Sequence, residues 1–356
     1  MKRHVMDSLD KKILTEIQSG LPAEERPFDA LAARLGIGAD ELLDRLRRLA
    51  RAGVIRRIGP VFDSRRLGYA STLVAARVPP ERLAEVAARV SRLPGITHNY
   101  ERRHAWNLWF TLTAPSAEAI EQALDELRRE TGIREFHSLP AEAVYKIRVQ
   151  FDLAGEIGEA SPISNSPRQC RGINHDIPRQ CRGINHGIPR QCHDIPRPCR
   201  GLSESQKELV RLVQDGLALE REPLADAAAR LGWTPAHVAE QIRQWLASGV
   251  IRRFGAVLAH RDVGYAANGM AAFRVPAERA DEAGRRAAEC AEVSHCYRRP
   301  AMPDFPYNLY AMIHGRSEAE VLAAAARMAE DSGAEAHEVL FSVREFKKIA
   351  MRYFVE

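Results

Sequence analysis

Two short stretches of this sequence combine side chains that can move protons with side chains that can bind anions. Residues 98–103 read HNYERR, and residues 295–299 read HCYRR. Histidine can donate a proton near neutral pH, and the planar guanidinium of arginine matches a carboxylate through two parallel hydrogen bonds. One His-Tyr pair alone is more simply explained as a half-buried polar pair. Its recurrence beside arginine favours a functional site.

Strand geometry predicts which of these side chains act together, because residues i and i+2 of a strand project from the same face. Three members of each stretch should share a face: His98, Tyr100 and Arg102 in the first, and His295, Tyr297 and Arg299 in the second. Arg103 and Arg298 would face the other way in a regular strand.

The two stretches belong to two copies of one module. GVIRR occurs at residues 53–57 and again at 249–253, an offset of 196 residues, and Asn-Leu at 107–108 recurs at 308–309. Nearly constant offsets with small insertions are typical of two diverged copies.

A repetitive segment separates the copies. Residues 161–201 contain an eleven-residue unit that begins as RQCRGINHDIP at residue 168, and their seven Arg and two Asp account for the whole formal net charge of +5. The segment has few large apolar residues, which predicts a disordered tether. Its alternating Cys and His lack the paired CxxC-like spacing of a zinc site.

The pattern within each copy predicts an α+β fold. Helical periodicity at residues 28–35 and 41–49, around a Gly-containing turn, indicates a helix-turn-helix followed by a wing, and the rest of the copy alternates as β-α-β-β-α-β, which is ferredoxin-like. We expect five regions in the 356 residues: a winged helix-turn-helix at 1–62, a ferredoxin-like domain at 63–155, a linker at 156–202, a second winged helix-turn-helix at 203–258 and a second ferredoxin-like domain at 259–356.

This layout resembles that of the Lrp/AsnC transcription regulators, and the motifs of the second domains resemble a narrower group. HNYERRHAWNLWFTL, HCYRRPAMPDFPYNLYAMIHG and LFSVREFKKIAMRYF are similar to segments of the two subunits of siroheme decarboxylase, from the heme d1 and alternative heme pathways. The resemblance covers both modules but not the linker, so the chain looks like a natural fusion of the two subunit types.

The resemblance implies an activity. It implies a carboxy-lyase that removes carbon dioxide from two acetate side chains of siroheme and leaves methyl groups. It also implies that no redox cofactor or metal is needed beyond the iron of the substrate itself. Siroheme is a planar tetrapyrrole fringed with eight carboxylates, so its site needs cations at the rim and flat apolar surface beneath the ring.

Matching the motifs to that chemistry gives candidate site residues. The candidate catalytic residues are His98, Tyr100, His295 and Tyr297. The candidate substrate-binding residues are Arg102, Arg103, Arg298, Arg299, Lys146, Arg344, Lys347, Lys348, Trp106 and Tyr307. No protein-bound metal is expected, although His98 or His295 could instead be an axial ligand of the siroheme iron.

Several alternatives remain open at this point. Trp109 and Tyr310 could supply flat contact area as well, although aromatic residues near these strands are more often core. The other histidines of the sheet domains are expected at the surface or in the core: His104, His137, His314 and His337. We expect the second copy to hold the stronger site.

The rival interpretation is a DNA-binding regulator, with or without the ability to sense a tetrapyrrole. The first recognition helix begins with Asp40, Glu41 and Asp44, where approach to phosphates would favour basic residues. DNA binding is therefore unexpected. With no long apolar run and no secretory signal at the N-terminus, we expect a cytoplasmic protein without membrane association. The two modules should pair within one chain, and the chain should form homo-oligomers.

Overall fold

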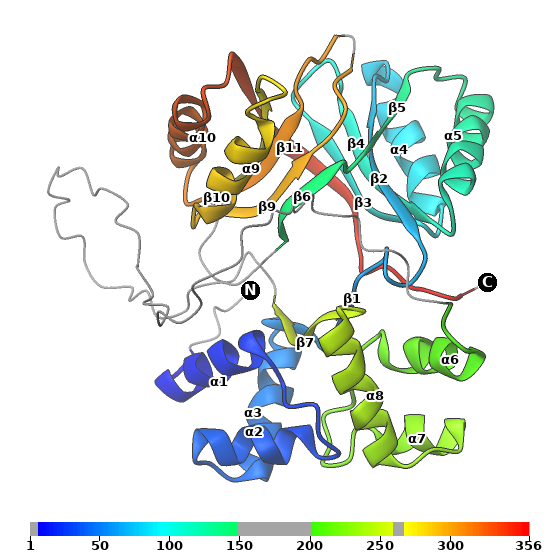
Figure 1. Ribbon diagram of the computed structural model, residues 1–356, viewed down its shortest axis with the longest axis vertical. Coiled ribbons are helices and arrows are strands. Elements are labelled where there is room, and N and C mark those ends of the chain that lie inside the picture. The colour runs from blue at the N-terminus through cyan, green and yellow to red at the C-terminus, as the bar shows by residue number, and fades with distance from the viewer. Residues whose placement is uncertain (1–5, 148–200, 259–266, 303, 356) are drawn as a thin grey trace, which may run out of the picture.

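The computed structural model describes residues 6–147, 201–258, 267–302 and 304–355. Residues 156–200 of the expected linker lie outside this range, so the prediction of a disordered tether is not addressed by the structure. Figure 1 shows two layers, with the helix-turn-helix domains below and a large sheet flanked by helices above.

The helix-turn-helix domains form as the periodicity predicts. The elements of the first are α1 (Ser8–Ser19), α2 (Pro27–Leu35), α3 (Ala39–Arg51) and β1 (Ile55–Phe62). Those of the second are α6 (Glu204–Val213), α7 (Ala225–Leu231), α8 (Pro235–Ser248) and β7 (Ile251–Leu258). Asp7 caps α1 in a reciprocal capping box with Asp10, and α2 ends at Gly36 in the left-handed conformation, which favours glycine.

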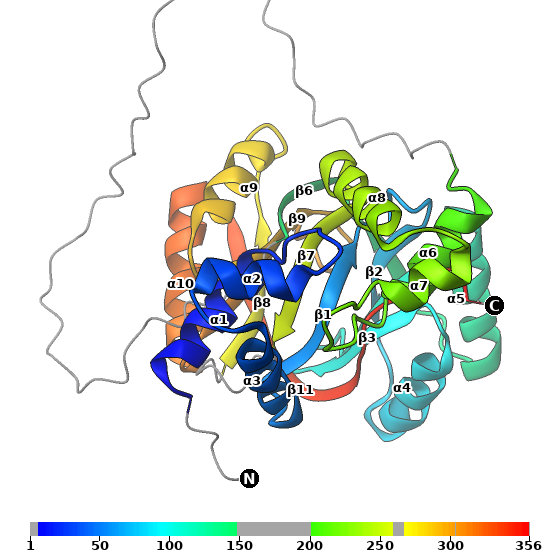
Figure 2. The same ribbon diagram turned by 90° about the horizontal axis from the view of Figure 1, so that it is seen from below.

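The expected wings pair with each other rather than within their own domains. Strands β1 and β7 form a two-stranded antiparallel sheet in which Gly59 lies opposite Gly255, and Figure 2 shows them side by side at the centre of this layer. A Cβ at Gly255 would lie 2.3 Å from the Ile17 carbonyl oxygen, so only glycine permits this approach of α1. The buried apolar residues of both domains form one continuous core.

The sheet domains follow the expected β-α-β-β-α-β order. In the first module the elements are β2 (Ala70–Ala76), α4 (Leu83–Arg92), β3 (Ile96–Arg102), β4 (Leu108–Ala114), α5 (Ala117–Thr131), β5 (Phe136–Pro140) and β6 (Ala143–Ile147). In the second they are β8 (Ala267–Arg274), α9 (Ala280–Glu289), β9 (Val293–Arg298), β10 (Leu309–Gly315), α10 (Glu318–Ser332) and β11 (Ala336–Lys348). The short 3-10 turn η1 (Pro80–Arg82) precedes α4.

The two modules share one sheet because each lends its last strand to the other. The strand order is β5-β2-β4-β3-β11-β8-β10-β9-β6. The first half of β11 pairs with β8 of its own module and the second half with β3 of the other, while β6 leaves the first module to pair with β9. Because β5 and β6 are consecutive in the chain yet stand at opposite ends of this order, the sheet closes on itself.

This exchange corrects one detail of the sequence interpretation. The expected β-α-β-β-α-β order ends the first module in a single strand, whereas the structure has two segments there, β5 and β6, that serve different modules. The outer face of the sheet packs against α4 and α5 on one side and α9 and α10 on the other. The inner face is therefore left for side chains that the helices do not cover. In the part of the chain that the structure describes, no helix is long and apolar enough to cross a lipid bilayer.

Candidate active site

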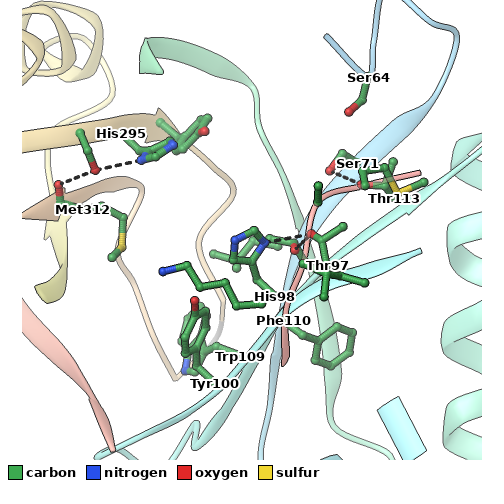
Figure 3. Close-up of a pocket in the computed structure, with 18 of the residues that line it drawn as sticks. Ser64, Ser71, Thr97, His98, Tyr100, Trp109, Phe110, Thr113, His295 and Met312 are labelled. Carbon is green, nitrogen blue, oxygen red and sulfur yellow. Dashed lines mark hydrogen bonds between the residues drawn. The ribbon is translucent and has the colours of Figure 1, made fainter. Parts of the chain in front are cut away.

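A cavity of about 490 Å³ lies inside the closed sheet, above the paired wing strands. Its walls come from both modules, and Figure 3 shows His98 and His295 on separate walls. Strand alternation explains the lining, because the residues that face inward alternate with those that pack under the outer helices. The volume falls within the usual range of small-molecule and cofactor sites.

His98 is held at the cavity wall by a hydrogen-bonded pair of threonines. Its Nδ1 lies 2.9 Å from the Thr97 hydroxyl, which lies 2.7 Å from the Thr111 hydroxyl. Burial, together with the positive charges of Lys348 and Arg56, lowers the pKa of His98 to about 4. His98 is therefore neutral in the ligand-free cavity at pH 7.

His295 occupies the equivalent place on the opposite wall but has a different partner. Its Nδ1 lies 2.9 Å from the Ser294 hydroxyl, and the same hydroxyl lies 2.7 Å from Nε2 of His314. Burial and the charge of Lys348 lower the pKa of His314. His314 was expected at the surface or in the core, but it lines the cavity. The signal for this was available, since His314 is four residues from Tyr310 and shares its strand face.

Each histidine lies beside the tyrosine of its motif, as the i, i+2 spacing predicts. The ring centroids of His98 and Tyr100, and those of His295 and Tyr297, are 6.2 Å apart. Burial raises the pKa of both tyrosines, and the Glu345 carboxylate raises that of Tyr100 further by accepting its hydrogen bond. Both hydroxyls therefore remain protonated at neutral pH and can donate hydrogen bonds.

Arg102 and Arg299 are the buried cations of the cavity. Each reaches a strand of the other module, where Nη1 of Arg102 donates to the Leu340 carbonyl at 2.7 Å and Nη1 of Arg299 donates to the Leu139 carbonyl. Burial lowers the pKa of both guanidiniums to about 10, so they stay charged at pH 7. Among the described residues neither forms an ion pair, and the Nε of each is buried without a hydrogen-bond partner. Buried cations without counter-ions indicate an anionic ligand.

Other predicted cations lie outside the cavity, and their contacts explain why. Arg103 is exposed, and Arg298 pairs with Asp281 at 2.8 Å on the outer face. Arg344 is mostly exposed, with Nε 3.6 Å from Glu101.

Two predicted lysines bind the ends of helices instead of lining the cavity. Nζ of Lys146 donates to the Cys290 carbonyl at the end of α9, and Nζ of Lys347 donates to the Ser91 and Leu93 carbonyls at the end of α4. Lys348, one residue further, does line the cavity.

Trp109 and Tyr310 border the cavity whereas Trp106 and Tyr307 do not, but Trp109 and Tyr310 are only 1% and 2% exposed and pack in the core. Trp109 and Tyr310 lie on the inward faces of β4 and β10. Trp106 is 2% exposed in the core, where Arg77 stacks on it at 4.5 Å, and Tyr307 packs edge-on against Phe305. Trp109 and Tyr310 thus lie closer to the cavity than Trp106 and Tyr307 but belong to the core, as the alternative for these aromatic residues expected.

The helix-turn-helix layer forms the floor of the cavity, which strand motifs alone could not reveal. Arg57 and Arg252 from the wings, Gln214 and Tyr353 all contribute to the lining. Arg57 is fixed by donating to the Pro60 and Gln214 carbonyls. No group of three or more metal-binding side chains occurs among the described residues.

Comparison with known proteins first defines the class. A family model described as the AsnC-like ligand binding domain matches residues 66–146 and 262–347, one stretch in each module. A second model, described as the siroheme decarboxylase NirDL-like HTH domain, matches residues 10–56 and 206–252.

Full-length relatives narrow the class to one family. A siroheme decarboxylase of Hydrogenobacter thermophilus is 33% identical over 346 residues, which are 97% of this chain and 95% of that protein. The siroheme decarboxylase NirDL subunit of Paracoccus pantotrophus is 36% identical over 348 residues, 96% of each chain. A crystal structure of the siroheme decarboxylase NirDL superposes with a TM-score of 0.72 at 30% identity, covering 98% of this chain and 95% of that one. The chain belongs to the siroheme decarboxylase family, as its motifs indicated.

The comparisons also account for the duplication. The siroheme decarboxylase alpha subunit of Desulfovibrio desulfuricans is 45% identical over 146 residues, and the beta subunit from the same organism is 42% identical over 153 residues. They span 41% and 43% of this chain and 84% and 96% of those proteins. One chain here carries both modules, and the structure pairs them through the shared sheet.

Proposed function

We propose that this protein removes carbon dioxide from two acetate side chains of siroheme, without net oxidation, to give didecarboxysiroheme. The proposal rests above all on Arg102 and Arg299, two buried guanidiniums that face one cavity without forming an ion pair among the described residues. A crystal structure of the related NirDL enzyme contains an iron-uroporphyrin III analogue. It superposes on this chain with a TM-score of 0.71, so a polycarboxylate tetrapyrrole suits this fold.

The reaction needs one proton for each carbon dioxide. Loss of carbon dioxide from an acetate leaves an electron pair on the side-chain carbon, which the conjugated macrocycle can delocalise. Protonation of that carbon then completes the methyl group. A positioned general acid is therefore the main chemical requirement of the site.

We assign the acid role to His98 and His295 and the carboxylate-binding role to Arg102, Arg299 and Lys348. The low pKa of His98 suits this assignment once substrate is considered. A bound polycarboxylate brings negative charge next to the imidazole and raises its pKa, so that protonation accompanies binding. In the alternative assignment one histidine is an axial ligand of the substrate iron.

The proposal requires no cofactor beyond the iron tetrapyrrole of the substrate. Trp109 and Tyr310 border the space for the ring, and Tyr297 offers a hydroxyl donor for its carboxylates. We further propose that the protein works in the cytoplasm, which suits the free thiols of Cys290 and Cys296. Association of the chain into homo-oligomers is also part of the proposal, and light scattering coupled to gel filtration tests it.

The decisive experiment is anaerobic incubation of the purified protein with siroheme, followed by mass spectrometry. The expected product has lost two molecules of carbon dioxide and keeps its iron. Unchanged siroheme after incubation with protein that binds it, as judged by visible absorption, would contradict the proposed reaction.

A DNA-binding regulator is the less favoured function. The family models and full-length relatives favour the decarboxylase, and the recognition helix α3 uses its charges within the protein. Arg45 and Arg48 both pair with the buried Asp10, and Asp40 at the start of α3 pairs with Arg221 of the other module. We therefore expect no salt-sensitive binding to its promoter DNA in a mobility-shift assay.

A further inference from the structure

The two walls of the cavity differ in one contact that bears on proton supply. On the His295 wall, the Ser294 hydroxyl lies between two imidazoles, 2.9 Å from His295 Nδ1 and 2.7 Å from His314 Nε2. The same hydroxyl can also donate to the Met312 carbonyl oxygen, at the longer distance of 3.5 Å. A hydroxyl that can accept from one ring and donate to the other can pass a proton between them.

The equivalent contact on the His98 wall ends without a second imidazole. Thr97 takes the place of Ser294 and bonds to His98, but its hydroxyl then meets Thr111 at 2.7 Å. Thr113 stands at the position that corresponds to His314, and it donates to Ser71 instead. A threonine hydroxyl does not take up a proton near pH 7, so this wall has no equivalent store.

We propose that His314 is a positioning residue that supplies protons to His295 through Ser294, which gives the second module a rechargeable acid that the first module lacks. The proposal rests on the proposed decarboxylation and extends it to a residue outside the His-x-Tyr motif.

The transfer balances without any other reactant. Nε2 of protonated His314 donates to the Ser294 oxygen while that hydroxyl donates its own proton to Nδ1 of His295, and Nε2 of His295 then protonates the carbon that has lost carbon dioxide. Afterwards Nε2 of His295 takes a proton from solvent, and the Nδ1 proton returns through Ser294 to His314. Each cycle consumes one solvent proton, as the reaction requires.

Burial and the charge of Lys348 on β11 lower the pKa of His314. Protonation of the relay formed by His314, Ser294 and His295 is therefore favoured by the negative charge of a bound polycarboxylate, and a proton held on His314 is given up readily. The neighbours on the adjoining strand positions carry no charge at neutral pH: Asn268 on β8, Met312 on β10, Ile147 on β6 and Tyr297 on β9. The Glu292 carboxylate, near the start of β9, is paired with Arg327.

The test compares His314→Gln and Ser294→Ala with His337→Gln. Glutamine can keep a hydrogen bond to Ser294 but cannot store a proton, and His337 is an exposed histidine of β11 outside the cavity. For His314→Gln we expect kcat to fall about tenfold with KM unchanged, and the alkaline limb of the kcat–pH profile to move to lower pH. Ser294→Thr, which restores the hydroxyl, should recover most of the rate lost in Ser294→Ala, and His337→Gln should match the wild type.

A second measurement needs no activity. In the full-length wild-type protein labelled with ¹³C-histidine, the NMR titrations of His295 and His314 should be coupled, and in Ser294→Ala they should become independent. Independent titrations in the wild type, or a wild-type kcat–pH profile in folded His314→Gln, would overturn the relay. Wild-type protein that converts no siroheme would instead overturn the proposed function, whereas coupled titrations would still support the relay.

Discussion

At the scale of single residues, the cavity is defined by charges that the fold does not need for itself. Arg102 and Arg299 are buried, yet their internal partners are backbone carbonyls rather than carboxylates. Desolvating a guanidinium without a counter-ion costs stability, which a bound anionic ligand restores. Such residues are expected where stability has been exchanged for binding.

The first prediction follows from this exchange. Arg299→Met should raise the KM for siroheme about 30-fold or more, since losing one partner of a buried charge pair costs at least about 2 kcal/mol. The melting temperature of the ligand-free protein should not fall, because methionine fills a similar volume without a buried charge.

Arg298→Met is the matched control for that prediction. Arg298 is adjacent in sequence but pairs with Asp281 outside the cavity, so its loss should leave KM near the wild-type value. Equal effects of the two substitutions, measured by steady-state kinetics and calorimetry, would contradict the assignment of Arg299 to the substrate.

His98 gives a prediction that requires no substrate. Its pKa in the fold is about 4, below the ordinary value of 6.5, so between these pH values the unfolded chain binds a proton that the folded protein does not. Stability from this group is therefore present above pH 6.5 and is lost as the pH falls towards 4. His98→Gln should show a shallower decline of melting temperature over this window, with His337→Gln as the control. Identical slopes for the wild type and His98→Gln would refute the assigned burial.

At the scale of elements, the last strands place the basic residues of the C-terminal motif in different environments. Lys347 and Lys348 are adjacent on β11, but the first binds the end of α4 and the second lines the cavity.

The third prediction contrasts Lys347 with Lys348. Lys347→Ala should lower the free energy of unfolding by about 1 kcal/mol with little change in KM. Lys348→Ala should raise KM several-fold, and the reverse pattern in chemical denaturation and kinetics would contradict this division.

The sequence alone predicts the helices and strands, and it predicts which residues of the two His-x-Tyr strands face inward. Both predictions rest on the spacing of apolar residues, with a period of 3.6 in helices and 2 in strands, which is a local property of the chain. It could not predict where β6 and β11 pair, since an exchanged strand has the same local pattern as one that stays in its module. That partner choice determines which lysine faces the cavity. The same limit applies to Trp106 and Trp109, which share one core cluster although only Trp109 borders the cavity.

At the scale of the whole molecule, the cavity exists only when both modules are paired. The strand pairs β3–β11 and β6–β9 and the β1–β7 wing pair all join residues from opposite sides of the linker.

The fourth prediction is that cleavage at a protease site engineered within residues 156–200 leaves both halves associated and active. Co-elution in gel filtration and retained turnover are the measurements. Separation of the halves under native conditions would show that the tether holds them together.

The closed sheet is nearly two-fold symmetric, but its two halves carry different side chains at one pair of equivalent positions. The two halves of the cavity are therefore not equivalent. Lys348 stands opposite His98 on β11, whereas Ile147 stands opposite His295 on β6. A macrocycle turned over by half a revolution would meet an ammonium where it had met an aliphatic side chain. Two identical subunits present both orientations equally, but two diverged modules favour one. The two diverged modules can therefore distinguish the edges of an asymmetric ring.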